Sequence, residues 1–238
     1  MLENKKVVIF DMDGTLIDSV GIWNEVDRSL IKKISTVEYD YKELENIQNI
    51  RDGKLKEYCG CKDPYVEYCG YLGNEFDSDL SKEEIHTLRY KIAEDYLKYK
   101  IDYKENADKL IKKLKNDGYT LAIASTTKRE NMRIYKTENA NIRDKADIDK
   151  YFSLILLKED VKELKPNPEV YLKVLDTLNV KAEDCIVFED SLIGVQAANA
   201  SGIDVVAIYD KYSDVNRDEI NKLANYSFNN YSEVLNCI

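Results

Sequence analysis

Five short apolar runs occur along the chain, and segments with helical spacing separate most of them. The first run, residues 7–10, is wholly apolar and rich in β-branched side chains, which is typical of a strand buried on both faces of a parallel sheet. Alternation of strands and helices indicates parallel strands joined by crossover helices. The pattern therefore predicts an α/β fold built on a doubly wound parallel sheet. The other expected strands are residues 121–124, 154–157, 185–188 and 205–208, with helices at residues 128–138, 168–178 and 192–200.

The segment after residue 19 has a different pattern, with charged stretches, helical spacing and no strong strand. Apolar residues recur every four positions from Ile22 to Ile34 and predict one helix, and apolar positions from 85 to 99 predict another. Between them, residues 51–74 hold several glycines and a proline, which favour loop and turn. We therefore predict a core domain formed by residues 1–18 and 101–238, and an inserted α-helical domain formed by residues 19–100.

Two acidic residues follow the first predicted strand directly. Asp11 and Asp13 lie on the same side of an extended chain because side chains alternate with period two, and Gly14 then allows a sharp turn. Adjacent carboxylates repel each other unless a cation or a proton offsets the charge. A lone D-x-D-G sequence also suits an ordinary turn. The buried strand before it, together with the polar residues that follow later strands, favours a functional site.

Further polar residues follow the other predicted strands, at the sheet edge where open α/β folds bind ligands. Ser125, Thr126 and Thr127 follow the second strand and open a helix, a position that suits an anion but also an ordinary helix cap. Lys165 precedes a proline-rich helix start, where a lysine is most often solvated. Glu189 and Asp190 follow the fourth strand and place a second acidic pair near the first.

Several carboxylates with a hydroxyl and a lysine beside them are the groups that hold a hard divalent cation and a phosphate. Mg²⁺ prefers oxygen ligands and often takes a substrate phosphate as one of them. The cation also removes the repulsion between a dianionic phosphate and a carboxylate. Asp11 is then a plausible nucleophile, because a free aspartate is ionised at neutral pH without a helper base.

Composition narrows the class of partner. The formal net charge is −10, with 45 acidic against 35 basic residues, so nucleic acid and anionic membranes are disfavoured as partners. The chain lacks an apolar run of membrane-spanning length and a signal-peptide pattern at its start, and we expect a cytoplasmic protein. An odd number of cysteines suits a reducing compartment. Three of these cysteines, Cys59, Cys61 and Cys69, are close enough for a soft-metal site, but ordinary thiols are the favoured interpretation.

The ordered motifs resemble those of the haloacid dehalogenase superfamily. The residues that carry the resemblance are the segment from Asp11 to Thr15, Ser125 at a strand end, Lys165, and the pair Glu189 and Asp190. The inserted segment resembles the α-helical cap of that superfamily, whose core is Rossmann-like. The sequences DGTLIDS and VFEDSLIGVQAANASG resemble its phosphatase and β-phosphoglucomutase-like branch.

The resemblance implies a role for each matched residue. Asp11 would be the nucleophile, and Asp13 would protonate the leaving alkoxide and then activate water. Ser125 and Thr126 would bind the transferring phosphoryl group, while Lys165 would offset its charge. Phosphoryl transfer depends mainly on positioning and charge stabilisation, so a few residues suffice.

The same resemblance implies a Mg²⁺ site. Asp11 would bind the ion through its carboxylate and Asp13 through its main-chain carbonyl. Asp190 would be a further ligand, and Glu189 would either bind the ion directly or support the groups that do.

Three other functions on the same fold are alternatives to a phosphatase: a dehalogenase, a phosphomutase and a catalytically idle binding protein. Asp13 argues against a dehalogenase, because carbon–halogen cleavage in this superfamily does not use an acid at that position. The β-phosphoglucomutase branch carries a cap histidine in the stretch that residues 20–24 occupy here, and this chain has Trp23 instead. Trp23 resembles phosphatase members of the family and favours a phosphatase over a phosphomutase, but its spacing also suits packing in the helical core. A catalytically idle binding protein on the same fold has no need of the full set of motifs.

We therefore expect an enzyme, a Mg²⁺-dependent phosphatase acting on a small phosphomonoester through an aspartyl-phosphate intermediate, with a β-phosphoglucomutase-like phosphomutase as the alternative. The substrate would be a sugar phosphate, a polyol phosphate or a compound like phosphoglycolate. Arg51, Lys54 and Lys56 form the nearest basic cluster in what the pattern indicates is a cap loop. We expect a monomer, since the chain shows no heptad pattern.

Overall fold

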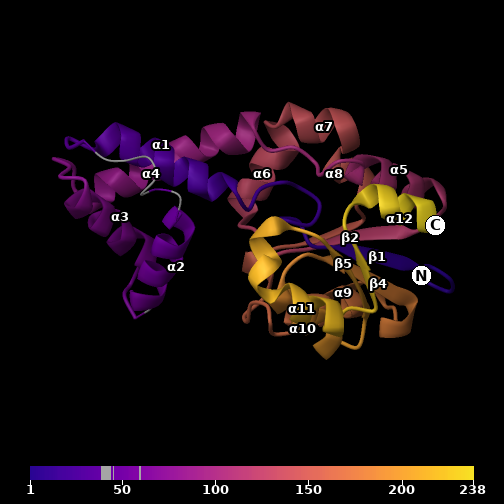
Figure 1. Cartoon of the computed structure of the whole chain (residues 1–238). Coiled ribbons are helices and arrows are strands. Elements are labelled where there is room, and N and C mark those ends of the chain that lie inside the picture. The colour runs from indigo at the N-terminus through magenta and orange to yellow at the C-terminus, as the bar shows by residue number, and fades with distance from the viewer. Residues whose placement is uncertain (39–43, 45, 59) are drawn as a thin grey trace. The chain divides into compact units, whose positions relative to one another are not determined.

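The computed structural model describes residues 1–38, 44, 46–58 and 60–238 (Figure 1). The described chain forms two compact units, one made of Met1–Val20 and Ile101–Ile238 and the other of Gly21–Lys100. The first unit contains a parallel sheet between helices, and the second is helical. The predicted fold class, a doubly wound α/β domain with an inserted helical domain, is confirmed.

The sheet of the first unit is entirely parallel, with strand order β3-β2-β1-β4-β5-β6. β1 and β4 lie at its centre and are buried along their whole length, which explains the apolar runs of residues 7–10 and 185–188. The five predicted strands are present, but a sixth, β6, was not predicted. Its sequence YSF is short and mostly exposed, so no apolar run marks it. The strands are β1 Val7–Phe10, β2 Thr120–Ala124, β3 Leu154–Leu156, β4 Cys185–Glu189, β5 Asp204–Ile208 and β6 Tyr226–Phe228.

Helices cover both faces of this sheet. In Figure 1, α5, α7, α8 and α12 lie above the strands, whereas α9, α10 and α11 lie below them. α5 packs on β2 from one side and α9 packs on β2 from the other. The helices of this unit are α5 Ala107–Asn116, α6 Arg129–Thr137, α7 Ala140–Ala146, α8 Ile148–Tyr151, α9 Glu169–Leu178, α10 Leu192–Ala200, α11 Arg217–Leu223 and α12 Tyr231–Cys237, with 3₁₀ turns η2 Lys158–Asp160, η3 Ala182–Asp184 and η4 Lys211–Asn216.

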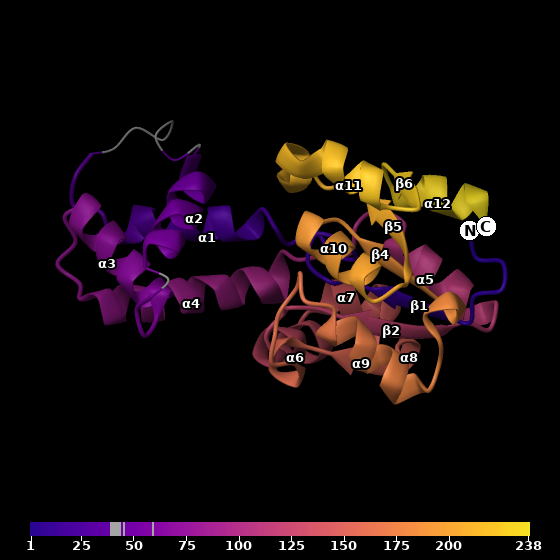
Figure 2. The same ribbon diagram turned by 90° about the horizontal axis from the view of Figure 1, so that it is seen from below.

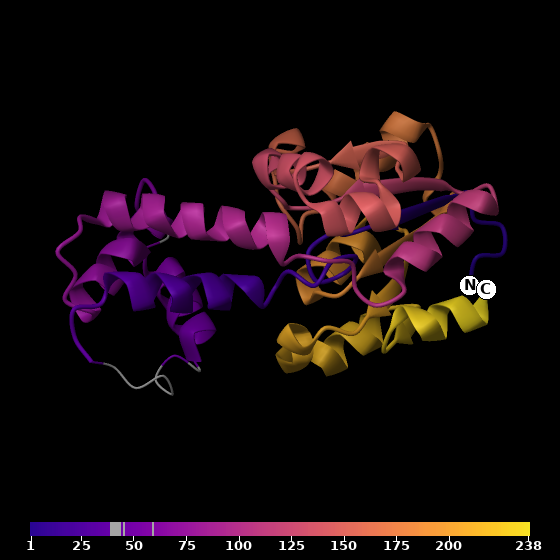
Figure 3. The ribbon, with the colours of Figure 1, turned by 90° about the horizontal axis from the view of Figure 1, so that it is seen from above.

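The second unit has its own apolar core among four helices. α1 and α4 run side by side (Figures 2 and 3), and α3 packs against α4. The core includes Val26 and Leu30 of α1 and Ile85 and Ile92 of α4, as the four-residue spacing predicted. The helices are α1 Ile22–Ile34, α2 Ile47–Glu57, α3 Pro64–Glu75 and α4 Lys82–Tyr99.

The predicted loop over residues 51–74 is wrong. α2 continues to Glu57, and α3 occupies most of the remainder, with Asp63 as its N-cap and Pro64 at its first position. Glycines within α3 are tolerated because they lie against α4: a Cβ on Gly73 would come within 2.8 Å of Ile85 Cδ1. Arg51, Lys54 and Lys56 therefore lie on the helix α2 and not in a loop.

The cysteines that the structure describes are free thiols. Cys61 and Cys237 are exposed, Cys69 and Cys185 are buried, and Cys59 lies outside the described residues.

Among the helices described here, none is both long enough and apolar enough to cross a membrane.

Candidate active site

The register of the central strands brings the two acidic pairs together. β1 and β4 are parallel neighbours, Phe10 pairs with Phe188, and the Asp11 amide donates to the Phe188 carbonyl at 3.0 Å. Asp11 and Glu189 therefore occupy adjacent positions where the two strands end. Asp11, Glu189 and Asp190 are buried, and each offers an oxygen within 4.8 Å of the others. The predicted convergence of acidic residues is present in the folded chain.

Lys165 extends into this acidic cluster. Its Nζ donates to Asp11 Oδ1 and to Glu189 Oε1 at 2.6 Å each, and to the Ala124 carbonyl at 2.9 Å. The side chain is 3% exposed, so the general expectation that such a lysine is solvated does not hold here. One ammonium group thus lies between two of the three carboxylates.

Glu189 is held by several donors besides Lys165. The Tyr171 hydroxyl donates to its Oε1 at 2.7 Å, and the Ser191 hydroxyl and the Asp190 amide donate to its Oε2 at 3.2 Å each. Gly194 provides the space for this carboxylate, because a Cβ there would lie 2.0 Å from the Glu189 carboxyl carbon. The sequence reasoning gave no role to Tyr171 or Gly194, although Gly194 stands in the motif that follows β4.

Asp190 is fixed by the loop that follows β1. The Thr15 hydroxyl donates to Asp190 Oδ1 at 2.8 Å. Gly14 has φ +83°, and a Cβ on it would lie 2.5 Å from Asp190 Oδ2. Glycine is therefore needed at this position for both its backbone angle and its size. Thr15 belongs to the motif that follows β1, but the sequence did not predict its contact with Asp190.

Asp13 lies beside the cluster and accepts hydrogen bonds from neighbouring hydroxyl groups, among them that of the buried Tyr135. Its Oδ1 accepts from Ser19 Oγ at 2.6 Å, and its Oδ2 accepts from Thr127 Oγ1. Thr127 also pairs with Ser125, with 2.9 Å between the two hydroxyl oxygens. Thr126, the expected phosphate contact, is exposed, whereas its neighbour Thr127 is buried. The roles assigned to Ser125 and Thr126 stay predictions.

The electrostatics of the cluster follow from its burial. Burial, together with the charges of Glu189 and Asp13, raises the pKa of Asp11 to about 7 against the opposing effect of Lys165. Burial and the neighbouring carboxylates also raise the pKa of Asp190 well above its ordinary value. Burial by itself would lower the pKa of Lys165, but Asp11 and Glu189 outweigh it and the net shift is strongly upward. When the three carboxylates of the cluster and the Lys165 ammonium are all ionised, the cluster carries excess negative charge.

This arrangement fits a hard divalent cation. The donor set consists of buried carboxylate oxygens, which are the ligands that Mg²⁺, Ca²⁺ and Mn²⁺ prefer. Asp11 and Asp190 are the better placed to hold such an ion, because Glu189 accepts more hydrogen bonds than either of them. Asp11 accepts one from Lys165, and Asp190 accepts one from Thr15 and a long one of 3.5 Å from Ser213.

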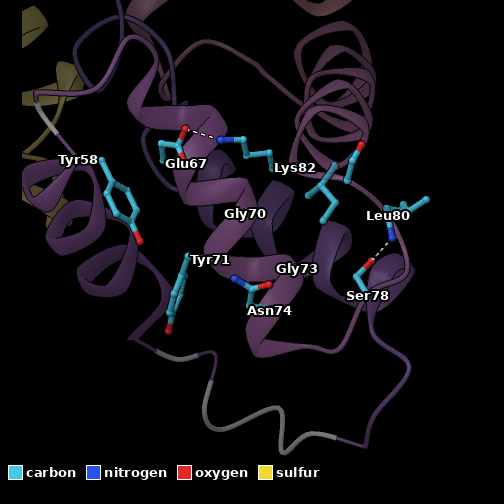
Figure 4. A pocket seen from close by; sticks show the side chains of 11 residues that line it. Tyr58, Glu67, Gly70, Tyr71, Gly73, Asn74, Ser78, Leu80 and Lys82 are labelled. Carbon is cyan, nitrogen blue, oxygen red and sulfur yellow. Dashed lines mark hydrogen bonds and ion pairs between the residues drawn. The ribbon is translucent and has the colours of Figure 1, made fainter.

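A separate hollow of about 430 Å³ lies in the second unit between α3 and the start of α4. Tyr58 and Tyr71 lie on one side of it, and Ser78 and Leu80 lie on the other (Figure 4). Lys82 and Glu67 form an ion pair of 2.6 Å at its edge. Its lining has no member of the acidic cluster.

Comparison with known proteins identifies the family. The profile described as haloacid dehalogenase-like hydrolase matches residues 8–208, most of the chain and all of the motifs above. The chain belongs to this family. It is an enzyme, a hydrolase, as the sequence predicted, and the resemblance to the phosphatase and β-phosphoglucomutase-like branch is confirmed.

Three relatives illustrate the similarity. The chain is 29% identical over 204 residues to the phosphorylated carbohydrates phosphatase of Thermotoga maritima, covering 84% of this chain and 82% of that protein. It is 30% identical to the protein CbbY of Rhodobacter capsulatus, covering 87% of each. A crystal structure from Thermotoga maritima, provisionally described as a β-phosphoglucomutase, superposes with a TM-score of 0.71 at 25% identity over 94% of each chain.

The first prediction concerns the packing of Gly194 against Glu189. Gly194→Ala should force the Glu189 carboxylate to move, lowering the free energy of unfolding by about 1–3 kcal/mol, as overpacking does, and weakening binding of a divalent cation. Gly53→Ala is the matched control, since nothing lies within 4 Å of a Cβ there. Urea unfolding and calorimetric cation titration measure both effects. Unchanged stability and cation affinity in Gly194→Ala would contradict this description.

The second prediction concerns pH. The pKa of Asp11 is about 7 in the folded protein against 3.8 ordinarily, so the folded chain holds a proton that the unfolded chain releases. Without metal, the free energy of unfolding should therefore fall as pH rises from about 4 to about 7. Metal binding requires the ionised carboxylates, so Mg²⁺ should raise Tm more at about pH 8 than at about pH 5. Thermal unfolding with Mg²⁺ or with EDTA measures this, and an equal rise at both pH values would refute it.

Proposed function

We propose that the protein is a Mg²⁺-dependent phosphatase that hydrolyses a small phosphomonoester through an aspartyl phosphate on Asp11. The observation that carries the proposal is the buried contact of Asp11 with Lys165, beside Glu189 and Asp190 and next to Asp13. Nucleophile, charge-offsetting cation, metal ligands and acid/base thus come from one edge of the sheet. The similarity to the phosphorylated carbohydrates phosphatase of Thermotoga maritima supports a sugar phosphate as substrate.

The chemistry proceeds in two displacements. In the first, Asp11 attacks phosphorus, the bond from phosphorus to the alkoxide breaks, and Asp13 gives its proton to that alkoxide. In the second, Asp13 takes a proton from water, which attacks the phosphoryl group, and inorganic phosphate leaves as Asp11 is regenerated. Lys165 holds Asp11 in place and offsets charge on the phosphoryl oxygens, for which Ser125 is a further donor.

The carboxylates of Asp11 and Asp190 would hold Mg²⁺, and the Asp13 carbonyl would be a further ligand. The charge of the ion would favour ionised Asp11 and would offset the repulsion between that carboxylate and the phosphate. The hydroxyls of Ser19 and Thr127 hold Asp13 outside the group of metal-binding carboxylates, where its carboxyl can exchange a proton. Glu189 would act by positioning Lys165, to which it bonds directly.

A phosphomutase is the second candidate, because the solved Thermotoga maritima structure is provisionally described as a β-phosphoglucomutase. Trp23, in α1, replaces the histidine expected of that branch and favours the phosphatase. We also propose that residues 19–100 act as a cap domain and that the protein works as a cytoplasmic monomer. A net charge of −10 supports the absence of a nucleic-acid or anionic-membrane partner.

The third prediction identifies the reaction. Phosphate release is measured with Mg²⁺ and with EDTA on sugar phosphates, polyol phosphates, phosphoglycolate and nucleotides, and a hexose 1-phosphate is monitored for conversion to the 6-phosphate. We expect Mg²⁺-dependent release that is greatest for one small phosphate ester. Isomerisation of the hexose phosphate without release would establish the phosphomutase instead.

The fourth prediction separates the roles of two aspartates. Asp11→Asn should lower kcat on the order of 10⁴-fold or more, because the amide is a poor nucleophile and lacks the charge that binds the cation. Asp13→Asn should lower kcat by about 10²- to 10⁴-fold, most severely for poor leaving groups, with cation affinity largely retained.

Asp18→Asn is the matched control for both variants, since Asp18 is exposed and lies in the same loop. Its kcat should equal that of the unaltered protein. Near-normal turnover by Asp11→Asn would remove the nucleophile assignment, and full activity of Asp13→Asn on a poor leaving group would remove the acid/base assignment.

A further inference from the structure

The helical unit contains a buried group of charges that the phosphatase chemistry does not use. Asp27 of α1 is fully buried and accepts from Arg51 of α2 at 2.8 Å and from Arg89 of α4 at 2.7 Å. The Tyr68 hydroxyl of α3 also donates to Asp27, at 3.2 Å. Four helices thus converge on one carboxylate, and two guanidinium groups share its single negative charge.

The two arginines are not equally satisfied. Arg51 also donates to the Asn24 side chain at 3.0 Å and approaches the exposed carboxylate of Asp52 at 3.8 Å. Arg89 is 1% exposed, and its Nε donates to Asp27. Its Nη2 is buried and has no hydrogen-bond partner among the residues that the structure describes. A buried charged donor without an acceptor is costly, because it loses its hydration and gains nothing in exchange.

Aromatic rings surround the Arg89 guanidinium. Its central carbon lies 5.1 Å from the ring centroid of Trp23, 5.3 Å from that of Tyr65 and 5.9 Å from that of Tyr68. Ring faces attract a cation but supply no acceptor oxygen for an N–H group. Tyr65 is 37% exposed, whereas Tyr68 is fully buried. Tyr65 is therefore the ring that an incoming molecule could displace.

We propose that Arg89, flanked by Trp23 and Tyr65, is a binding site for an oxyanion group, a carboxylate or a phosphate, carried by a small molecule. Such a group supplies the acceptor oxygen that Nη2 lacks and balances the second guanidinium charge. The planar guanidinium fork suits both anions, and the rings suit an apolar face of the molecule that carries them. Every residue of this site belongs to the second unit, so the inference does not depend on the phosphatase proposal.

The fifth prediction tests this site through the protein's only tryptophan. The full chain in EDTA is titrated with inorganic phosphate and, separately, with acetate, and Trp23 emission is recorded at constant ionic strength maintained with chloride. We expect a saturable change with one or both anions. Saturation with phosphate alone selects a tetrahedral ligand, and saturation with acetate alone selects a carboxylate.

Arg89→Lys is the decisive variant, because it keeps the positive charge that pairs with Asp27 but removes Nη2. It should weaken anion binding by about tenfold or more, as loss of a charge-assisted hydrogen bond does. Its core site is unaltered, so a signal that arises from phosphate bound there would persist. The same midpoint in Arg89→Lys, or no saturable change in the unaltered protein, overturns the proposal.

A substitution at the exposed ring provides a second test if Arg89→Lys fails to fold. Tyr65→Ala removes the ring that covers the guanidinium and should speed anion association, measured by stopped-flow emission. Tyr65→Phe keeps the ring and should leave the rate unchanged. Equal association rates in Tyr65→Ala and Tyr65→Phe would overturn the assigned route to Arg89.

Discussion

Three carboxylates and one ammonium group share the buried edge where β1 and β4 end, and the rest of the first unit is arranged around their charge. Lys165 contacts Asp11 and Glu189, but one cation cannot balance three anions. Folding therefore leaves an excess of negative charge at this edge of the sheet. The raised pKa of Asp11 expresses the same excess of charge. The same excess of buried negative charge that suits the site to bind a cation therefore also lowers the stability of the folded chain.

The surrounding structure holds this charge through groups that have no direct part in phosphoryl transfer. Tyr171 donates to Glu189, Thr15 donates to Asp190, and Thr127 donates to Asp13. Gly14 and Gly194 leave the space that two of these carboxylates occupy. Each carboxylate is thereby held in one orientation before any ligand arrives. Positioning and charge stabilisation are what phosphoryl transfer requires, so this rigidity accords with the proposed chemistry.

The buried charges of the helical unit have the opposite excess. There the excess is positive, because Arg51 and Arg89 share Asp27. A buried ion pair contributes little net stability when desolvation is counted, so the contacts of Arg51 and Arg89 with Asp27 are not expected to be a main source of the unit's stability. The unit was expected from its spacing to be helical, and its fold agrees. Its charged centre was not expected, since the sequence placed Arg51 in a solvated loop.

The sequence by itself determined where the first five strands lie along the chain, because burial on both faces of a sheet requires apolar runs. Asp11, Glu189 and Asp190 could be named because they directly follow two of those runs, whereas Lys165 was named through the family resemblance. Only the tertiary structure decided that Thr127 contacts Asp13, that β6 joins the sheet, and that α2 and α3 replace a loop. Those outcomes depend on contacts between residues far apart in the chain, where packing overrides local glycine and turn preferences.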